Sequence, residues 1–373
     1  MHFSRKTWAI TTLLLAAFSL SACAGDIDPL SLLPEDTSVL VKIDFEKLTG
    51  ADIFTDLNIE LLGKVPGYTQ FTRLLEKAQC TPLEPDSDKP AGYVKEAYLA
   101  KARINESEDD VVALLIGKAE LRYTITILKK ELPDAVVKTP EETGAKYYSI
   151  KGLFHKDETL FMVQLEGAIG VARTGKAALE FLGREAQTEG ARGIRKNEAF
   201  NALANKLIPV ESTFDRSPLI TAIVLIDADS RKMFARGDDV DTKLFQYVKF
   251  AWLKIDSGAN GFNIQARCEC TGEEDAGSIE IALKMFFLRA MLTAENPPMR
   301  DVFRKVGKSV KTIITGNEDE RKAFVDISPD LSYPDSVDII KEIKLLALGA
   351  DKPEETHPHE PGPGLETQPD TGK

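Results

Sequence analysis

The stretch Ser38-Val-Leu-Val-Lys-Ile-Asp44 decides the fold, because the same pattern returns in the second half of the chain. Its β-branched and apolar residues predict a short strand, and the closing Asp44 is suited to cap a following helix. Leu219-Ile-Thr-Ala-Ile-Val-Leu-Ile-Asp227 has the same form and again ends in Ile-Asp. We therefore expect two units that each open with a strand and a capped helix.

The order of elements after each opening strand is also repeated. Val94-Lys-Glu-Ala-Tyr-Leu99 corresponds to Val248-Lys-Phe-Ala-Trp-Leu253, with Tyr98 in the place of Trp252. Further strands are predicted at 111–116, 145–150, 160–165, 168–173, 262–270, 310–315 and 322–327, and helices at 119–132, 175–184, 274–293 and 336–348. Tight polar turns between neighbouring strands favour antiparallel pairing. The sequence thus predicts an α+β fold of two similar antiparallel-sheet domains, each with helices packed on one face.

The expected domain boundaries follow from this duplicated unit. They are a signal peptide at 1–22, a tether at 23–33, a first α+β domain at 34–190, a connecting helix and linker at 191–216, a second α+β domain at 217–350 and a tail at 351–373. The linker contains a predicted helix at 197–207. The tail is acidic, rich in Pro and Gly, and almost without apolar side chains, so it is predicted to be disordered.

The N-terminus has the features of an export signal. Arg5 and Lys6 precede an uncharged apolar run at 8–20, which is too short to span a bilayer. Leu20-Ser21-Ala22-Cys23 then resembles the lipobox of bacterial lipoproteins. The resemblance implies that a diacylglycerol is attached to Cys23 and that the chain is cut just before it. Ordinary cleavage with soluble release is the alternative, because Ala22-Cys23-Ala24 also fits a small-residue cleavage site.

This anchor predicts a location on the periplasmic side of the cell envelope. In the enterobacterial sorting rule, an Asp directly after the lipidated cysteine favours retention in the inner membrane. This position is Ala24, so resemblance to that rule favours the outer membrane over the inner membrane. The membrane itself is then the first expected partner, with a protein of the envelope as a second.

Charge and histidine content narrow the range of functions. The chain has 47 Lys and Arg against 59 Asp and Glu, a net charge of −12, which argues against nucleic acid as a partner. Of four histidines only His155 falls in the predicted folded body, so no metal site is expected. His155 with Asp157 could act as a general base, but no nucleophile motif accompanies it and a turn residue is the preferred interpretation. No cofactor-binding motif occurs, and we expect a protein that is not an enzyme.

Two cysteines share one face of a predicted strand. Along 261–270 apolar and polar residues alternate, which places Cys268 and Cys270 together on the apolar side. Buried structural thiols are the preferred interpretation. A disulfide between one of them and Cys80, or a soft-metal or redox site, stays open as an alternative.

The helix predicted at 274–293 is unusually apolar around its circumference. Such a helix is expected to be buried on more than one side. It could form core between the two domains, or it could line a cleft for an apolar ligand, with Met285, Phe286 and Met291 on the cleft wall.

The start of the body resembles a group of exported bacterial proteins of unknown function. Leu33-Pro-Glu-Asp-Thr37 carries the resemblance, since in these proteins a Leu-Pro-x-Asp-Thr lead precedes a strand and a helix. It implies no catalytic residues. The preferred function is a non-enzymatic binding or scaffolding module of the envelope. The alternatives are a carrier or assembly factor for an apolar ligand such as a lipid, and a hydrolase without a recognisable motif.

Overall fold

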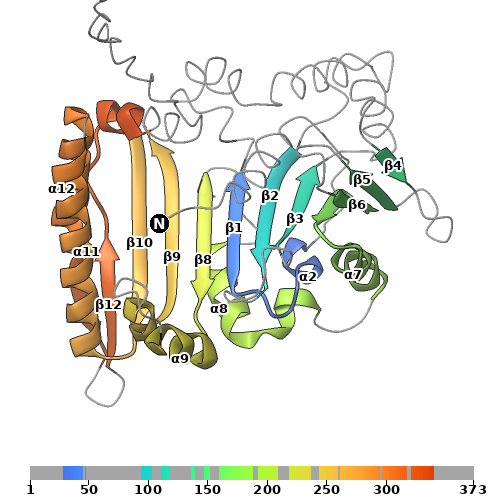
Figure 1. Ribbon diagram of the computed structural model, residues 1–373, viewed down its shortest axis with the longest axis horizontal. Helices are drawn as coiled ribbons and strands as arrows, with labels where there is room; N and C mark the ends of the chain where they lie inside the picture. Colours follow the sequence, from blue (N-terminus) through green and yellow to red (C-terminus); the bar gives the residue numbers. More distant parts are fainter. Residues whose placement is uncertain are drawn as a thin grey trace, which may run out of the picture.

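A single antiparallel sheet dominates the protein (Figure 1). The computed structural model describes residues 28–44, 47, 94–102, 111–117, 136–138, 147–151, 159–187, 192–208, 218–236, 243–258, 261–294, 296–316 and 321–339. Within this part of the chain twelve strands form one sheet, in the order β11-β12-β10-β9-β8-β1-β2-β3-β7-β6-β5-β4. The predicted α+β class with antiparallel pairing is confirmed, and the two halves of the chain share one continuous sheet.

The first half of the chain supplies the strands from the centre to one end of the sheet. They are β1 (Val39–Asp44), β2 (Val94–Lys101), β3 (Val111–Gly117), β4 (Val136–Lys138), β5 (Tyr147–Lys151), β6 (Thr159–Leu165) and β7 (Ala168–Ala172). The second half supplies β8 (Ile220–Leu225), β9 (Val248–Gly258), β10 (Gly261–Cys270), β11 (Lys311–Thr315) and β12 (Lys322–Ile327). The halves meet where β1 pairs with β8, which places Lys42 opposite Thr221.

Helices lie against both faces of this sheet. The first half and the following linker contribute α2 (Pro29–Leu32), α7 (Gly175–Ala186), the 3-10 helix η3 (Gly193–Lys196) and α8 (Glu198–Leu207), and the second half contributes α9 (Ala228–Arg236), the 3-10 helix η4 (Leu244–Tyr247), α11 (Glu273–Thr293) and α12 (Pro297–Ser309). Ile223 belongs to the core under α7 and α8, whereas its neighbour Val224 packs in the core under α11. Because successive strand residues point to opposite faces, the two groups of helices cover opposite faces of the sheet.

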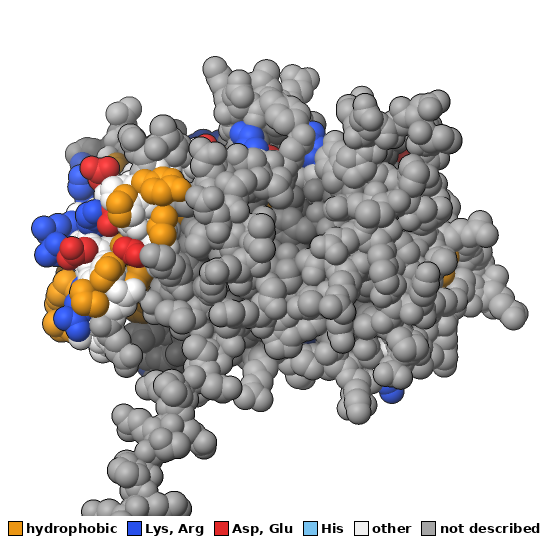
Figure 2. Space-filling model, turned by 90° about the horizontal axis from the view of Figure 1, so that it is seen from above, with side chains coloured by type: hydrophobic (Ala, Val, Ile, Leu, Met, Phe, Trp, Pro, Cys, Tyr) orange, Lys and Arg blue, Asp and Glu red, His pale blue; other side chains and the backbone are white. Residues whose placement is uncertain are grey.

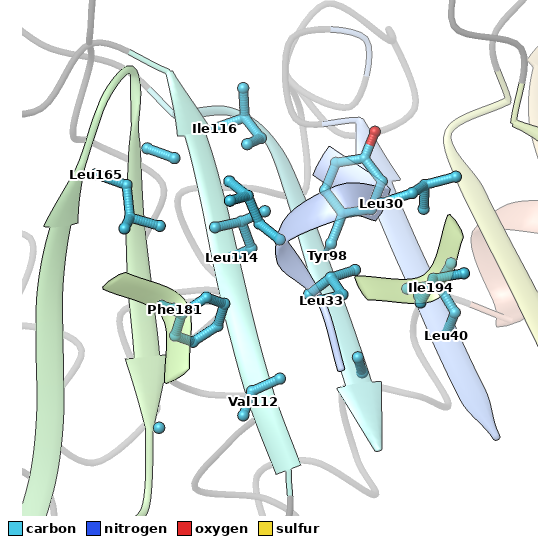
Figure 3. Packing of buried hydrophobic residues seen from close by; sticks show 14 of the residues in the cluster. Leu30, Leu33, Leu40, Tyr98, Val112, Leu114, Ile116, Leu165, Phe181 and Ile194 are labelled. Carbon is cyan, nitrogen blue, oxygen red and sulfur yellow. The ribbon is translucent and has the colours of Figure 1, made fainter. Parts of the chain in front are cut away.

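The larger core lies between the first half of the sheet and the helices α2, α7, η3 and α8 (Figure 3). Phe181 of α7 and Phe200 of α8 are fully buried in it. Leu30, Leu32 and Leu33 are buried in the same core, although the sequence analysis assigned them to the tether. Residues 28–33 therefore belong to the folded body. Three leucines in one short segment are better placed in a core than in water.

The expected helix caps are confirmed in both halves. The backbone N–H of Lys47 donates to Oδ1 of Asp44 at 3.0 Å, and that of Ser230 donates to Oδ1 of Asp227 at 2.7 Å. Asp44 is the last residue of β1 and Asp227 follows β8 by two residues, and each carboxylate accepts from the amide three residues later, as an N-cap residue does.

Besides the two short 3-10 helices η3 and η4, three elements of the described chain were not predicted from the sequence. They are α2, β4 and α12. α12 begins with Pro297 directly after Asn296, and proline is well tolerated in the first helical turn, where its missing N–H costs no hydrogen bond. The helix predicted at 119–132 lies outside the described residues. Of the helix predicted at 336–348, only residues up to 339 are described, and residues 333–339 are helical.

Candidate binding surface

The helix α11 stands at one end of the sheet and is packed along one side. It starts after Gly272 with Glu273, Glu274 and Asp275 in its first turn, where negative charge interacts favourably with the helix dipole. Ala276 and Ile279 are buried against β10 and β12, in a core that includes Cys270 and Val325. The N-terminal half of α11 therefore packs directly on the sheet.

The C-terminal half of α11 also packs on α12. A Cβ atom at Gly307 of α12 would lie only 3.2 Å from Cβ of Phe287, so the absence of a side chain lets the two helices approach closely. Phe287 is partly buried there. Leu283 and Phe287 also pack in the core on the sheet, so the opposite, outer side of α11 faces away from both the sheet and α12.

Glu280 joins α11 to the edge of the sheet. Its Oε2 accepts from the backbone N–H of Thr312 at 2.7 Å, and its Oε1 lies 2.5 Å from Nζ of Lys284. The hydrogen bond from Lys284, followed by the bonds from Thr312, lowers the pKa of Glu280. Because β11 is the edge strand, this carboxylate satisfies a backbone amide that would otherwise be open to pairing with another chain.

The side of α11 opposite to the sheet is also apolar, and it is exposed. We call the four residues Ile281, Met285, Leu288 and Leu292 the outer stripe; their exposed fractions are 66%, 57%, 44% and 70%. Their spacing of four, three and four residues places them within about 60° of the helix circumference. Figure 2 shows apolar side chains beside Lys and Arg side chains at the end of the molecule that holds α11 and α12.

The outer stripe has basic borders. At 100° per residue Lys284 lies on one side of it and Arg289 on the other, and both are exposed. Arg289 separates the outer stripe from Phe286, which is 58% exposed farther around the helix. A contiguous exposed apolar patch with a polar border is typical of an interaction site.

The expectation that this helix is buried on more than one side is wrong. Met285 and Phe286 are exposed, and Met291 is half-buried. The structure thus places these three residues on different sides of α11, with two of them open to solvent. The cleft that they were predicted to line stays a prediction.

Cys268 and Cys270 lie together in the core under α11, as the alternation in β10 predicts. Both are free thiols. Burial raises the pKa of Cys268 to about 11 and that of Cys270 to about 12, so both are protonated at neutral pH. A protonated, buried thiol is a poor nucleophile and a poor metal ligand, which favours the structural interpretation. Cys80 lies outside the described residues, and its pairing stays a prediction.

A buried ion pair lies where the two halves of the sheet meet. Nζ of Lys42 is 2.8 Å from Oε1 of Glu96, and the hydroxyl of Tyr98 donates to Oε2 of the same carboxylate at 2.8 Å. Burial, and then the charge of Glu96, raises the pKa of Tyr98 well above its usual value. On the neighbouring strand β8, opposite Lys42, Thr221 is buried, and its hydroxyl has no hydrogen-bond partner in the described part of the chain. The charged groups of this cluster are paired with one another, which suits a structural role.

Several predicted features lie outside the described residues, among them Cys23, His155 and the tail at 351–373. In the residues that are described, no three His, Cys, Asp or Glu side chains are grouped as a metal site would require. Among the same residues no helix has both the length and the apolar character needed to cross a bilayer.

Comparison with known proteins adds little to this picture. No protein-family model and no curated protein matches the chain. Among solved structures, crystal form III of TP0453 is similar with a TM-score of 0.44 and 8% sequence identity, over 85% of this chain and 98% of that chain. Crystal form I of TP0453 gives 0.42 and 7% over the same shares. Similarity at this level supports no argument about function.

Proposed function

We propose that the protein is a lipoprotein held at the periplasmic side of the cell envelope, where it acts as a non-enzymatic binding or scaffolding module. The single observation that supports the binding role is the outer stripe of α11, an exposed apolar surface opposite to the packed side of the same helix. The anchoring role rests on Leu20-Ser21-Ala22-Cys23. Two or more acyl chains on one residue bind a bilayer stably.

The folded body begins very soon after the proposed anchor. Asp28 is held by Arg195, whose Nε and Nη2 lie 2.8 Å from Oδ2 and Oδ1 of the carboxylate. Asp28 follows Cys23 by five positions, so the chain between them reaches at most about 18 Å. A lipid on Cys23 would therefore hold the surface around α2 and η3 close to the bilayer.

The anchoring proposal is tested by replacing the cysteine. Cys23→Ser removes the thiol that would carry the diacylglycerol, and we expect the protein to leave the membrane fraction. Cys80→Ser is the matched control, because it removes another thiol outside the described residues and should leave the distribution unchanged. If the Cys23→Ser chain stays with the membranes as the wild type does, lipidation is not what holds it there.

We also propose that the two halves of the sheet derive from one duplicated unit. From the centre outward the strand order is β1-β2-β3-β7-β6 in one direction and β8-β9-β10-β12-β11 in the other. The caps at Asp44 and Asp227 occupy the same place in each half. The strand registers are offset, since Tyr98 pairs with Lys42 whereas Trp252 pairs with Ile223. Both aromatic residues nevertheless pack in the same core.

A further inference from the structure

We infer that the outer stripe of α11 binds the outer stripe of a second copy of this chain, with the two helices antiparallel. The inference deepens the proposed binding role by naming the partner, and it rests on that role. Four observations on α11 support it: the spacing of the apolar residues, the narrowness of the outer stripe, the match of the stripe with itself and the positions of its basic neighbours.

The spacing and the width of the outer stripe favour a helix as the partner. Positions 281, 285, 288 and 292 follow the four-three alternation of a coiled-coil seam. A helix that lies on a broader apolar surface presents an apolar face of about 100° or more, whereas a strict seam is narrower. The outer stripe spans about 60°, and Lys284 and Arg289 each lie about 40° beyond its borders. A bilayer surface is therefore the less suitable occupant.

The outer stripe matches itself when one helix is reversed. In an antiparallel pair Ile281 lies opposite Leu292 of the other copy, and Met285 lies opposite Leu288. Each contact then occurs twice around a two-fold axis, as in most homodimers. The same surface on both copies is sufficient, and no further partner is needed to cover the apolar residues.

The basic neighbours select the antiparallel arrangement. In a parallel pair Lys284 of one helix would lie beside Arg289 of the other, and the two charges would repel. In the antiparallel pair Lys284 lies along Met291 of the other copy and Arg289 along Ala282. Lys284 can then cover the sulfur-containing side chain with its methylene groups while Nζ keeps its contact with Glu280.

The contact is small, which predicts a weak dimer in dilute solution. Stable interfaces bury about 800 Å² on each partner, more than four side chains provide. Anchoring all copies to one bilayer raises their effective concentration, so that a weak contact becomes populated. The test therefore uses the full chain in its own membrane.

The experiment is cysteine cross-linking in isolated membranes, followed by separation under non-reducing conditions. A chain with both Ile281→Cys and Leu292→Cys should form a covalent dimer, because the two positions face each other. Neither substitution alone should do so, because the equivalent residues of the two copies lie about 16 Å apart along the axis of an antiparallel pair. Adding Met285→Glu should reduce the cross-linked fraction at least about tenfold, since a carboxylate would be buried against Leu288.

A pair of cysteines on the exposed side of α12, Arg304→Cys with Lys308→Cys, is the matched control and should give no dimer. Cross-linking of the single Ile281→Cys chain would overturn the antiparallel arrangement. Failure of the double variant would overturn the dimer. If Met285→Glu then weakens binding of the chain without its leader to phosphatidylglycerol vesicles, a membrane is the occupant and the binding role stands. If that substitution changes neither measurement, the binding role itself has lost its support.

Discussion

Lys42 shows how a single charged residue can be placed inside a sheet. It lies on the buried side of β1, beside Leu40, with Glu96 and Tyr98 on the neighbouring strand. A buried charge is costly unless it is paired, and the pair is not in itself a strong source of stability. The ion pair instead specifies which residues of β1 and β2 lie side by side, because either charge buried without the other is strongly unfavourable.

We predict that Lys42→Met lowers the free energy of unfolding by about 3 kcal/mol, because it leaves Glu96 buried without its cation. Denaturant unfolding of the single variant measures the loss. The double variant Lys42→Met/Glu96→Gln removes both charges and should recover a large part of the stability. A single variant as stable as the wild type would show that the pair is not buried in solution.

Local sequence patterns correctly predict where several single residues lie. The alternation along β10 correctly places Cys268 and Cys270 on the buried side, and the Ile-Asp endings correctly predict two caps. Both signals are local, because strand periodicity and capping depend on neighbours a few residues apart. The pairing of Lys42 with Glu96 joins residues of different strands, and no local pattern predicts it.

At the scale of elements, the two caps provide a comparison between the halves. We predict that Asp44→Ala and Asp227→Ala each lower the free energy of unfolding by about 1 kcal/mol, because each removes an acceptor from a helix N-terminus. Asp229→Ala is the control: Asp229 is exposed on α9 and interacts with Lys232 at the surface, so its loss should change stability little. Equal losses at Asp44 and Asp227 would support equivalent roles, and no loss at either would contradict the capping geometry.

The contact between α11 and β11 predicts a dependence on pH. The lowered pKa of Glu280 means that its ionised form is favoured in the folded state. Its contribution to stability is therefore complete above the unfolded pKa of about 4.3 and is lost as the pH falls through the lower folded value.

We expect Glu280→Gln to remove this contribution, so that unfolding free energies of variant and wild type differ most at neutral pH and converge in acid. Denaturant unfolding at several pH values between about 7 and 3 measures the difference. A difference that is independent of pH would mean that the ionised carboxylate does not hold the edge strand.

The exposure of α11 is a feature that the sequence did not predict. The apolar residues of α11 are evident in the sequence, but their number alone cannot distinguish a helix buried on two sides from one with an exposed outer stripe. The difference depends on how α11 packs against α12 and the sheet, which leaves the outer stripe uncovered. Because α12 was not predicted, the position of the outer stripe could not be predicted either.

For the whole molecule, the strand order is the property least accessible from sequence. β1 and β8 are adjacent in the sheet although most of the first half of the chain lies between them. Repeated patterns suggest two units but do not say whether they form separate sheets or one. The folded body also begins earlier in the chain than the sequence predicts, since Leu30 and Leu33 of the expected tether are buried in the core.

Because the folded body begins as early as residue 28, the placement of the molecule on the membrane depends on the lipid anchor proposed at Cys23. If Cys23 carries acyl chains, about 18 Å of chain at most connects the bilayer to Asp28, and the orientation of the molecule on the membrane is restricted. The most direct measurement is mass spectrometry of the N-terminal peptide of the mature protein purified from membranes. We expect a chain that begins at Cys23 and carries a diacylglycerol mass on that residue. A mature chain with an unmodified Cys23, or one that begins at another residue, would contradict this expectation.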